Sequence, residues 1–172
     1  MNWGNYLFSF DGRINRAKMW LFILIAIVAY IVFGLVLNFA FDASLFAYLM
    51  MIARRPADLV AAGMPLALVL FGLFYLIVFY VGLAVSAKRL HDRNKGAIWL
   101  LIFIVLPLVL NIVGAIVAAP DLTTGLPGTS PLKMILSLAS FILSIWGFVE
   151  LYCLRGTVGD NQYGPDPLPP KA

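Results

Sequence analysis

Four long runs without a charged residue constrain this chain more than any other feature. They cover residues 19–41, 59–87, 96–120 and 134–149. A membrane hydrocarbon core about 30 Å thick needs roughly 20 apolar residues in a helix, and three of the runs exceed that length. The fourth reaches it when the helix ends near Leu132 and Leu154 are included. The runs predict an all-α polytopic membrane protein, a bundle of four transmembrane helices with short loops.

The composition supports a membrane rather than a soluble fold. Hydrophobic residues make up 63% of the 172 residues and charged residues only 12%, whereas a soluble domain has about 45–50% apolar and about 25% charged residues. No segment outside the runs is long enough for a second core, so residues 1–172 are expected to form one domain. We place the spans at about 19–41, 65–87, 97–119 and 132–154, followed by a cytoplasmic tail at 155–172.

The basic residues predict how the chain crosses the membrane, because Lys and Arg concentrate in short cytoplasmic loops. Nine of the 12 Lys and Arg residues lie before the first span, between the second and third spans, or in the tail. The remaining three are Arg54, Arg55 and Lys133. We therefore expect a multi-pass protein of the bacterial inner membrane with both termini in the cytoplasm. Orientation and lipid headgroups account for the net charge of +4, so no nucleic-acid partner is expected.

Pro107 interrupts the third run, where it removes a backbone hydrogen bond and predicts a kink. Asn111 follows one turn later and is expected to bond the carbonyl that Pro107 leaves free. Small residues recur at helical spacing in the third and fourth runs, which predicts close helix packing there.

Polar residues concentrate in three segments, Asp11–Trp20, Lys88–Trp99 and Gly156–Pro167. Arginine and carboxylate side chains in these segments can form specific bidentate pairs. We therefore expect the three segments to meet at one cytoplasmic face, here called the polar cap. Its candidate residues, for a structural cap or an anion-binding site, are Arg13, Arg16, Arg89, His91, Asp92, Arg93, Asn161 and Tyr163.

The same segments carry a resemblance to a known family. They read Gly-Arg-x-x-Arg-x-x-x-Trp from Gly12, Arg-Leu-His-Asp-Arg-Asn-Lys-Gly from Arg89, and Asn-x-Tyr-Gly-Pro-Asp-Pro from Asn161. In this order around four spans they resemble the family called domain of unknown function 805, small bacterial inner-membrane proteins. Gly96–Trp99 departs from the Gly-Trp-Trp of relatives, and the first outer loop is long. The resemblance implies location and membership and supplies no reaction.

The leading functional hypothesis is a non-catalytic integral membrane protein whose polar cap binds lipid headgroups or a membrane protein partner. One alternative is a membrane-embedded enzyme that acts on a lipid or phosphate-bearing substrate with His91 as general base. Another is a small accessory subunit of a transporter, although the spans lack the charged groups of coupled transport. The chain has one His and one Cys, Cys153, so no cofactor or metal is expected. The sequence leaves the oligomeric state open.

Overall fold

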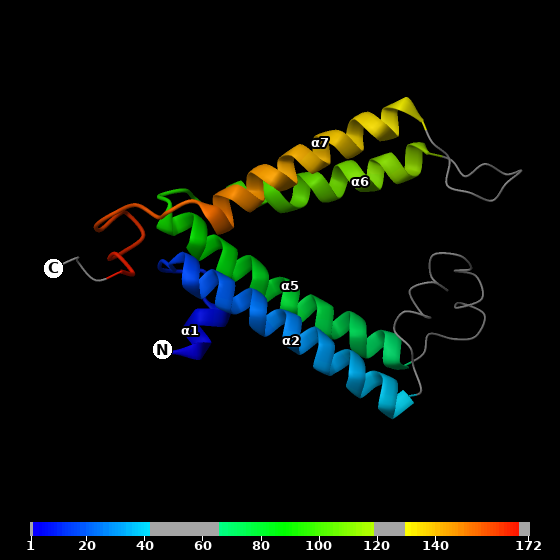
Figure 1. Ribbon diagram of the computed structural model, residues 1–172, viewed down its shortest axis with the longest axis horizontal. Helices are drawn as coiled ribbons and strands as arrows, with labels where there is room; N and C mark the ends of the chain where they lie inside the picture. Colours follow the sequence, from blue (N-terminus) through cyan, green and yellow to red (C-terminus); the bar gives the residue numbers. More distant parts are fainter. Residues whose placement is uncertain (1, 42–65, 119–129, 169–172) are drawn as a thin grey trace, which may run out of the picture.

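The computed structural model describes residues 2–41, 66–118 and 130–168, and within these ranges the regular structure is entirely helical. The all-α prediction is thereby confirmed. The elements are α1 (Trp3–Phe8), α2 (Arg16–Phe41), α5 (Leu66–Asp92), η1 (Leu101–Val105) continuing into α6 (Leu106–Val117), and α7 (Pro131–Phe148) continuing into η2 (Val149–Cys153) (Figure 1).

Three helices are long and apolar enough to cross a membrane: Arg16–Ala40, Leu66–Asp92 and Pro131–Cys153. They correspond to the first, second and fourth predicted spans. The third predicted span holds the shorter apolar helix Leu101–Val117, preceded by turns at residues 93–98. The predicted span ends at 65 and 119 lie outside the described residues.

The first half of the middle polar segment is helical, although it lies between the predicted second and third spans. Helix α5 continues to Asp92, five residues beyond the predicted span end at residue 87. The tight turn follows it, with Asn94 in the left-handed region at φ 58°. Because the helix continues, Lys88, Arg89 and Asp92 are held on a rigid element rather than on a loop.

The helices are arranged as two pairs, which differs from the single bundle that we expected. Helix α2 runs beside α5, and α6 runs beside α7; the pairs meet at the polar end and diverge from it (Figure 1). Each pair has its own interface. Phe33 and Phe74 stack at 4.2 Å between ring centroids in the first pair, whereas a Cβ on Gly147 would lie 2.9 Å from Phe103 in the second.

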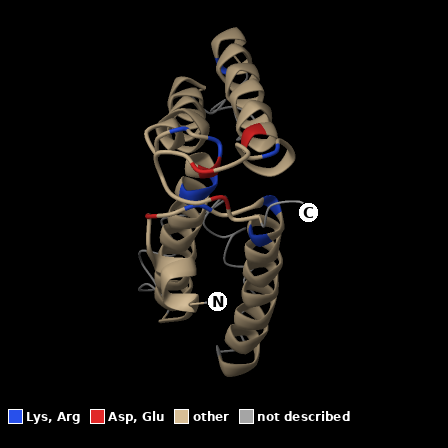
Figure 2. Ribbon diagram, turned by 90° about the vertical axis from the view of Figure 1, so that its left-hand side faces the viewer, with Lys and Arg blue, Asp and Glu red and all other residues tan. Residues whose placement is uncertain are grey.

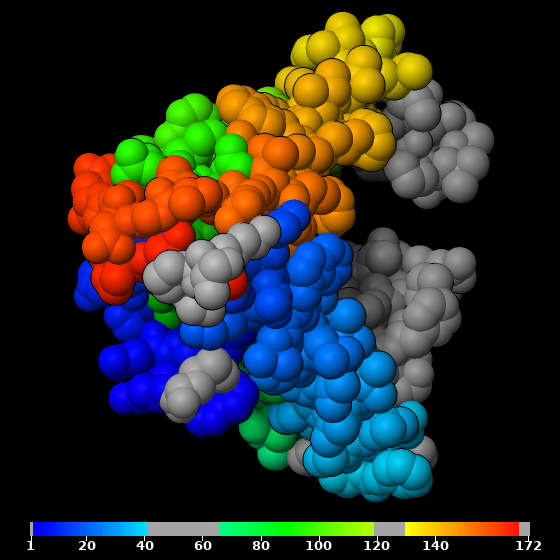
Figure 3. Space-filling model, turned by 60° about the vertical axis from the view of Figure 1, so that its left-hand side comes forward, coloured from blue at the N-terminus to red at the C-terminus, as the bar shows by residue number. Residues whose placement is uncertain are grey.

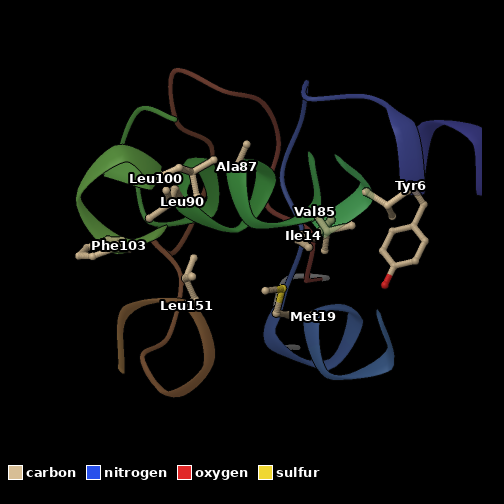
Figure 4. Close-up of a cluster of buried hydrophobic side chains, with 10 residues drawn as sticks. Tyr6, Ile14, Met19, Val85, Ala87, Leu90, Leu100, Phe103 and Leu151 are labelled. Atoms are coloured by element: carbon tan, nitrogen blue, oxygen red, sulfur yellow. The ribbon is translucent and has the colours of Figure 1, made fainter. Parts of the chain in front are cut away.

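The buried core lies at the end where the pairs meet (Figure 4). Its apolar members come from α1, α2, α5, η1 and η2, and they include Tyr6, Met19, Leu90, Phe103 and Leu151. Away from this end, many apolar side chains of the helices are exposed, as expected for surfaces that face lipid. The core therefore lies directly beneath the polar cap.

The region around Pro107 is not a simple kink. The stretch Leu101–Val105 is π-helical, and Leu106 N–H donates to the carbonyl of Leu101. Pro107 is the second residue of α6, where its missing N–H costs little. Asn111 Nδ2 donates to the carbonyl of Pro107 itself, at 2.8 Å, and to Ser140 Oγ, at 2.6 Å. The expected partner of Asn111 was the carbonyl left free by Pro107, and that expectation is wrong. The side chain instead links α6 to α7.

Candidate functional site

The three polar segments meet where the two helix pairs join, and the structure brings all eight candidate residues to this end. Figure 2 looks toward this end and shows the charged residues gathered there, while the helices beyond it are almost free of charge. Lys133, near the start of α7, is the described basic residue at the opposite end.

Asp92 is the centre of the polar cap. Its Oδ1 accepts from Nε and Nη2 of Arg13, each at 3.2 Å, and its Oδ2 accepts from Nη1 of Arg89. Both arginines are buried, Arg89 completely. The backbone at Gly156 packs against the same carboxylate so closely that a Cβ there would clash with Oδ2. One carboxylate thus pairs with two buried guanidinium groups, which would be very costly to leave unpaired.

Backbone carbonyls satisfy the remaining donors of Arg13. Its Nη1 donates to Gly159 O at 2.7 Å and to Gly164 O at 3.0 Å, and its Nη2 donates to Thr157 O at 2.7 Å. These acceptors all belong to the tail, so an arginine near the amino terminus fixes the path of the carboxy-terminal segment.

Arg89 makes the corresponding bonds to the end of the last helix. Its Nε donates to Leu151 O at 3.0 Å, and its Nη2 donates to Leu154 O. Every nitrogen of the Arg13 and Arg89 side chains therefore has an acceptor within the protein. Both guanidinium groups are therefore buried and held on every nitrogen by the protein itself.

His91 is held between the amino-terminal segment and the tail. Its Nδ1 lies 3.2 Å from the carbonyl of Gly12, and its ring stacks on Tyr163 with centroids 3.9 Å apart and planes within 2°. Asn161 Nδ2 donates to the His91 carbonyl at 2.9 Å. A general base is normally oriented by a carboxylate, whereas the orienting acceptor here is a backbone carbonyl. No group of three metal-ligating side chains occurs among the described residues.

A second ion-pair cluster centres on Glu150 in η2. Its carboxylate lies 2.7 Å from Arg93 Nε and 2.8 Å from Lys95 Nζ. Lys95 Nζ also lies 4.9 Å from the ring centroid of Trp99. This cluster ties the turn after α5 to the end of α7.

The sequence reasoning missed Lys88, Lys95, Glu150 and Thr157 as members of the polar cap. Lys88 Nζ donates to Asn5 O at 2.8 Å and so fixes α1 on α5. Thr157 N–H donates to Asp92 O at 2.8 Å. Glu150 had a usable signal, because it ends an apolar run that otherwise lacks charge. The partners of Lys88 and Thr157 are backbone groups, which residue spacing does not indicate.

Arg16 and Arg155 differ from the inner arginines and are here called the outer arginines. Both are exposed and border one small pocket near Asn15 and Pro167. Arg16 Nη1 donates to Cys153 O at 2.9 Å, which leaves its Nε and Nη2 without a partner in the described chain. The Arg155 side chain makes no hydrogen bond or ion pair with the described residues. These two guanidinium groups keep donors that an external anion can accept.

Two groups outside the long helices have shifted pKa values. Burial raises the pKa of the Tyr6 hydroxyl, which donates to the carbonyl of Lys18 at 2.5 Å. Backbone N–H bonds from Leu168 and Gly159 lower the pKa of Asp166. The tail turn is therefore held by a carboxylate that stays ionised at neutral pH.

Comparison with known proteins identifies the family. The family model described as "Protein of unknown function (DUF805)" matches residues 7–165. The chain belongs to the DUF805 family. Among DUF805-like relatives, inner membrane protein YhaH of Escherichia coli K12 is 25% identical over 163 residues, 95% of this chain and 89% of YhaH. The uncharacterized protein YiiR of the same strain is 27% identical over 161 residues, 94% of this chain and 87% of YiiR.

No solved structure matches the chain. The family match covers the first two polar segments, the third as far as Pro165, and the described helices between them. Together with the apolar helices, membership makes this a membrane protein of a family whose molecular function is unknown.

Proposed function

We propose that this protein is a non-catalytic, four-span protein of the bacterial inner membrane with both termini in the cytoplasm. In this proposal the polar cap fixes the helix ends and the tail, and the outer arginines bind anionic lipid headgroups. The observation that carries it is the contrast between two sets of arginines. Arg13 and Arg89 are buried, and each of their side-chain nitrogens donates to an internal acceptor, whereas Arg16 and Arg155 are exposed with open donors.

The location of the outer arginines supports a lipid headgroup as the anion. Arg16 begins α2, one of the three span-length helices, and Trp20 follows it one turn later and is exposed. Arginine and tryptophan at a span end favour the headgroup depth. The described basic residues other than Lys133 gather at the same end, which is the pattern expected of a cytoplasmic face.

Two further points support four membrane crossings and location in the inner membrane. The apolar stretch that contains Leu101–Val117 begins at Gly96 and includes no charged residue, so it can complete a fourth crossing. YhaH, which is similar over most of its length, is named an inner membrane protein.

The experiment compares lipids that differ only in charge. The protein is purified from vesicles containing equal amounts of phosphatidylglycerol and phosphatidylcholine with identical chains, and retained lipids are counted by native mass spectrometry. We expect a preference for phosphatidylglycerol that falls about tenfold or more in the double variant Arg16→Gln/Arg155→Gln, since each basic group near the surface contributes about 1 kcal/mol.

Lys133→Gln is the matched control, because it removes one positive charge at the opposite end of α7. Its lipid preference should equal that of the wild type. Equal retention of the two lipids by the wild-type protein, or a preference that survives the double substitution, would contradict headgroup binding at the outer arginines.

A further inference from the structure

A groove of about 240 Å³ lies beneath the polar cap, between α2 and α5 and beside η1 and η2. Figure 3 shows the start of α2, in blue, directly beneath the orange end of α7 and η2. Phe22, Ala26 and Tyr30 line the groove from α2 at a spacing of four residues, which places them on one face of that helix. The lining is mostly apolar, so the groove suits a hydrocarbon occupant.

Ser86 is the lining residue whose only side-chain group is polar; the other hydroxyls belong to the aromatic rings of Tyr30, Tyr75 and Tyr152. Its side chain belongs to α5, the residue is only 5% exposed, and it borders the groove. Within the described residues its hydroxyl makes no hydrogen bond. The donor of this hydroxyl is therefore available to an occupant of the groove, so an occupant with an acceptor at this point would be favoured over pure hydrocarbon.

The dimensions of the groove correspond to one leaflet of a bilayer. Along α5 it extends from Ser86 to Tyr75, eleven residues or about 16 Å of helix. Half of a 30 Å hydrocarbon core is about 15 Å. An acyl chain that begins with its ester at Ser86 would therefore end near the middle of the membrane.

The groups between Ser86 and the polar cap match the part of a glycerophospholipid that precedes its ester. Ile14 N–H donates to Lys88 O at 3.4 Å, so antiparallel α2 and α5 bring Ser86 level with the first turn of α2. The side chain of Arg16 leaves that turn toward the polar end, because Cβ atoms point toward the helix amino terminus. A cation, a hydroxyl donor and an apolar groove thus follow one another, as phosphate, ester carbonyl and acyl chain do in a glycerophospholipid.

We infer that this groove binds one acyl chain of a glycerophospholipid, with the Ser86 hydroxyl donating to its ester carbonyl. The contact between its phosphate and Arg16 rests on the proposed function, whereas the groove and Ser86 contacts do not depend on it.

The first test uses phosphatidylcholine alone, which has no net charge. Protein from these vesicles is examined by native mass spectrometry for one tightly retained lipid. Ala26→Phe fills the groove and should lower retention about tenfold or more. Val28→Phe adds the same ring two residues away, where the side chain is exposed, and should retain lipid like the wild type. Equal retention by the two variants, or a protein dimer without lipid, would overturn the inference.

The second test requires no substitution that risks misfolding. Phosphatidylcholine with ether-linked chains lacks the ester carbonyls, so the wild-type protein should bind it about two- to tenfold more weakly than the ester form, the range of one hydrogen bond. Ser86→Ala should bind both forms equally. A wild-type protein without an ester preference would disprove the role of Ser86.

The outcomes separate this inference from headgroup binding. Loss of retention in Ala26→Phe without a preference for phosphatidylglycerol would support the groove and refute the outer arginines. A preference for phosphatidylglycerol that depends on Arg16 and Arg155, with equal retention in Ala26→Phe and Val28→Phe, would support the opposite conclusion.

Discussion

At the scale of single residues, the carboxylate of Asp92 has the largest structural role in the polar cap. It pairs with Arg13 and Arg89, and its own backbone carbonyl accepts from Thr157. The amino-terminal segment at Arg13 and the tail at Thr157 therefore both bond to this one residue of α5. A buried pair of this kind contributes little net stability over a well-packed apolar substitute, but breaking it by removing one partner is costly.

We expect Asp92→Asn to destabilise the protein by about 3–5 kcal/mol, because two buried guanidinium groups lose their counter-charge. Thermal unfolding in detergent measures the change. Arg13→Gln should be non-additive with it, since both substitutions break the same pair.

Asp11→Asn serves as the control for Asp92→Asn. Asp11 is exposed, and its side chain forms no hydrogen bond or ion pair with the described residues. Its unfolding temperature should stay close to that of the wild type. Equal effects at the two positions, or additivity with Arg13→Gln, would mean that the polar cap is not an energetic unit.

The sequence indicated which residues gather at this end but not what each one does there. The motif spacing identified eight candidates, and the structure places them together. It did not indicate that Arg13 and Arg89 point inward while Arg16 points outward. That difference depends on the positions of backbone carbonyl groups in the tail and η2. Every residue has a carbonyl, so the sequence does not show which of them will accept from an arginine.

At the scale of elements, the α6–α7 pair depends on close backbone approach. A Cβ on Gly147 would lie 2.9 Å from Phe103, whereas one on Gly114 would have its nearest neighbours at 3.8 Å. Both glycines lie where the two helices of this pair pack together, but Gly147 has less space around it than Gly114. This contrast permits a matched comparison of the same substitution.

Gly147→Ala should destabilise the protein by about 1–3 kcal/mol, the usual cost of overpacking. Gly114→Ala should be neutral or stabilising by up to about 1 kcal/mol, because alanine restricts the unfolded chain more than glycine does. Unfolding of both variants in the same detergent measures the difference. Equal destabilisation would contradict the packing described for Gly147.

Pro107→Ala should insert into the membrane with a normal yield and should straighten the third apolar segment. Restoring the N–H removes the reason for the π-helical stretch at Leu101–Val105. Spin labels at Ile98 and Ile116, both exposed, should then be farther apart in the variant than in the wild type. An unchanged distance would show that packing against Gly147 and Phe103 maintains the stretch, and loss of insertion would show that Pro107 is needed for folding.

The presence of long apolar helices and their approximate positions were predictable at this scale, because long uncharged apolar runs are typical of membrane-spanning helices. The continuation of α5 to Asp92 was not predicted, since charged residues were assigned to a loop. Their burial depends on partners from α1 and the tail, which a local pattern does not contain. The pairing of helices in twos was also missed, because every helix has apolar residues on all faces and so none marks a preferred neighbour.

At the scale of the whole molecule, the arrangement predicts one orientation. Helix α1, the tail as far as residue 168 and the turn after α5 lie at the end that carries the polar cap (Figure 1). Reporter fusions at Lys95 and Ala172 should therefore report the cytoplasm, and a fusion at Asp121, outside the described residues, should report the periplasm. A cytoplasmic signal at Asp121 would contradict the four-span topology.

The bonds between Arg13 and the tail also have a consequence for biosynthesis. The acceptor Gly159 O lies 146 residues after Arg13 in the chain, so the ribosome must finish almost the entire protein before this contact can form. Until then a buried guanidinium lacks acceptors that only the last segment supplies. Closure of the polar cap is thus a late event that follows insertion of the helices. A chain truncated before the tail would stay open and would be a ready substrate for membrane proteases.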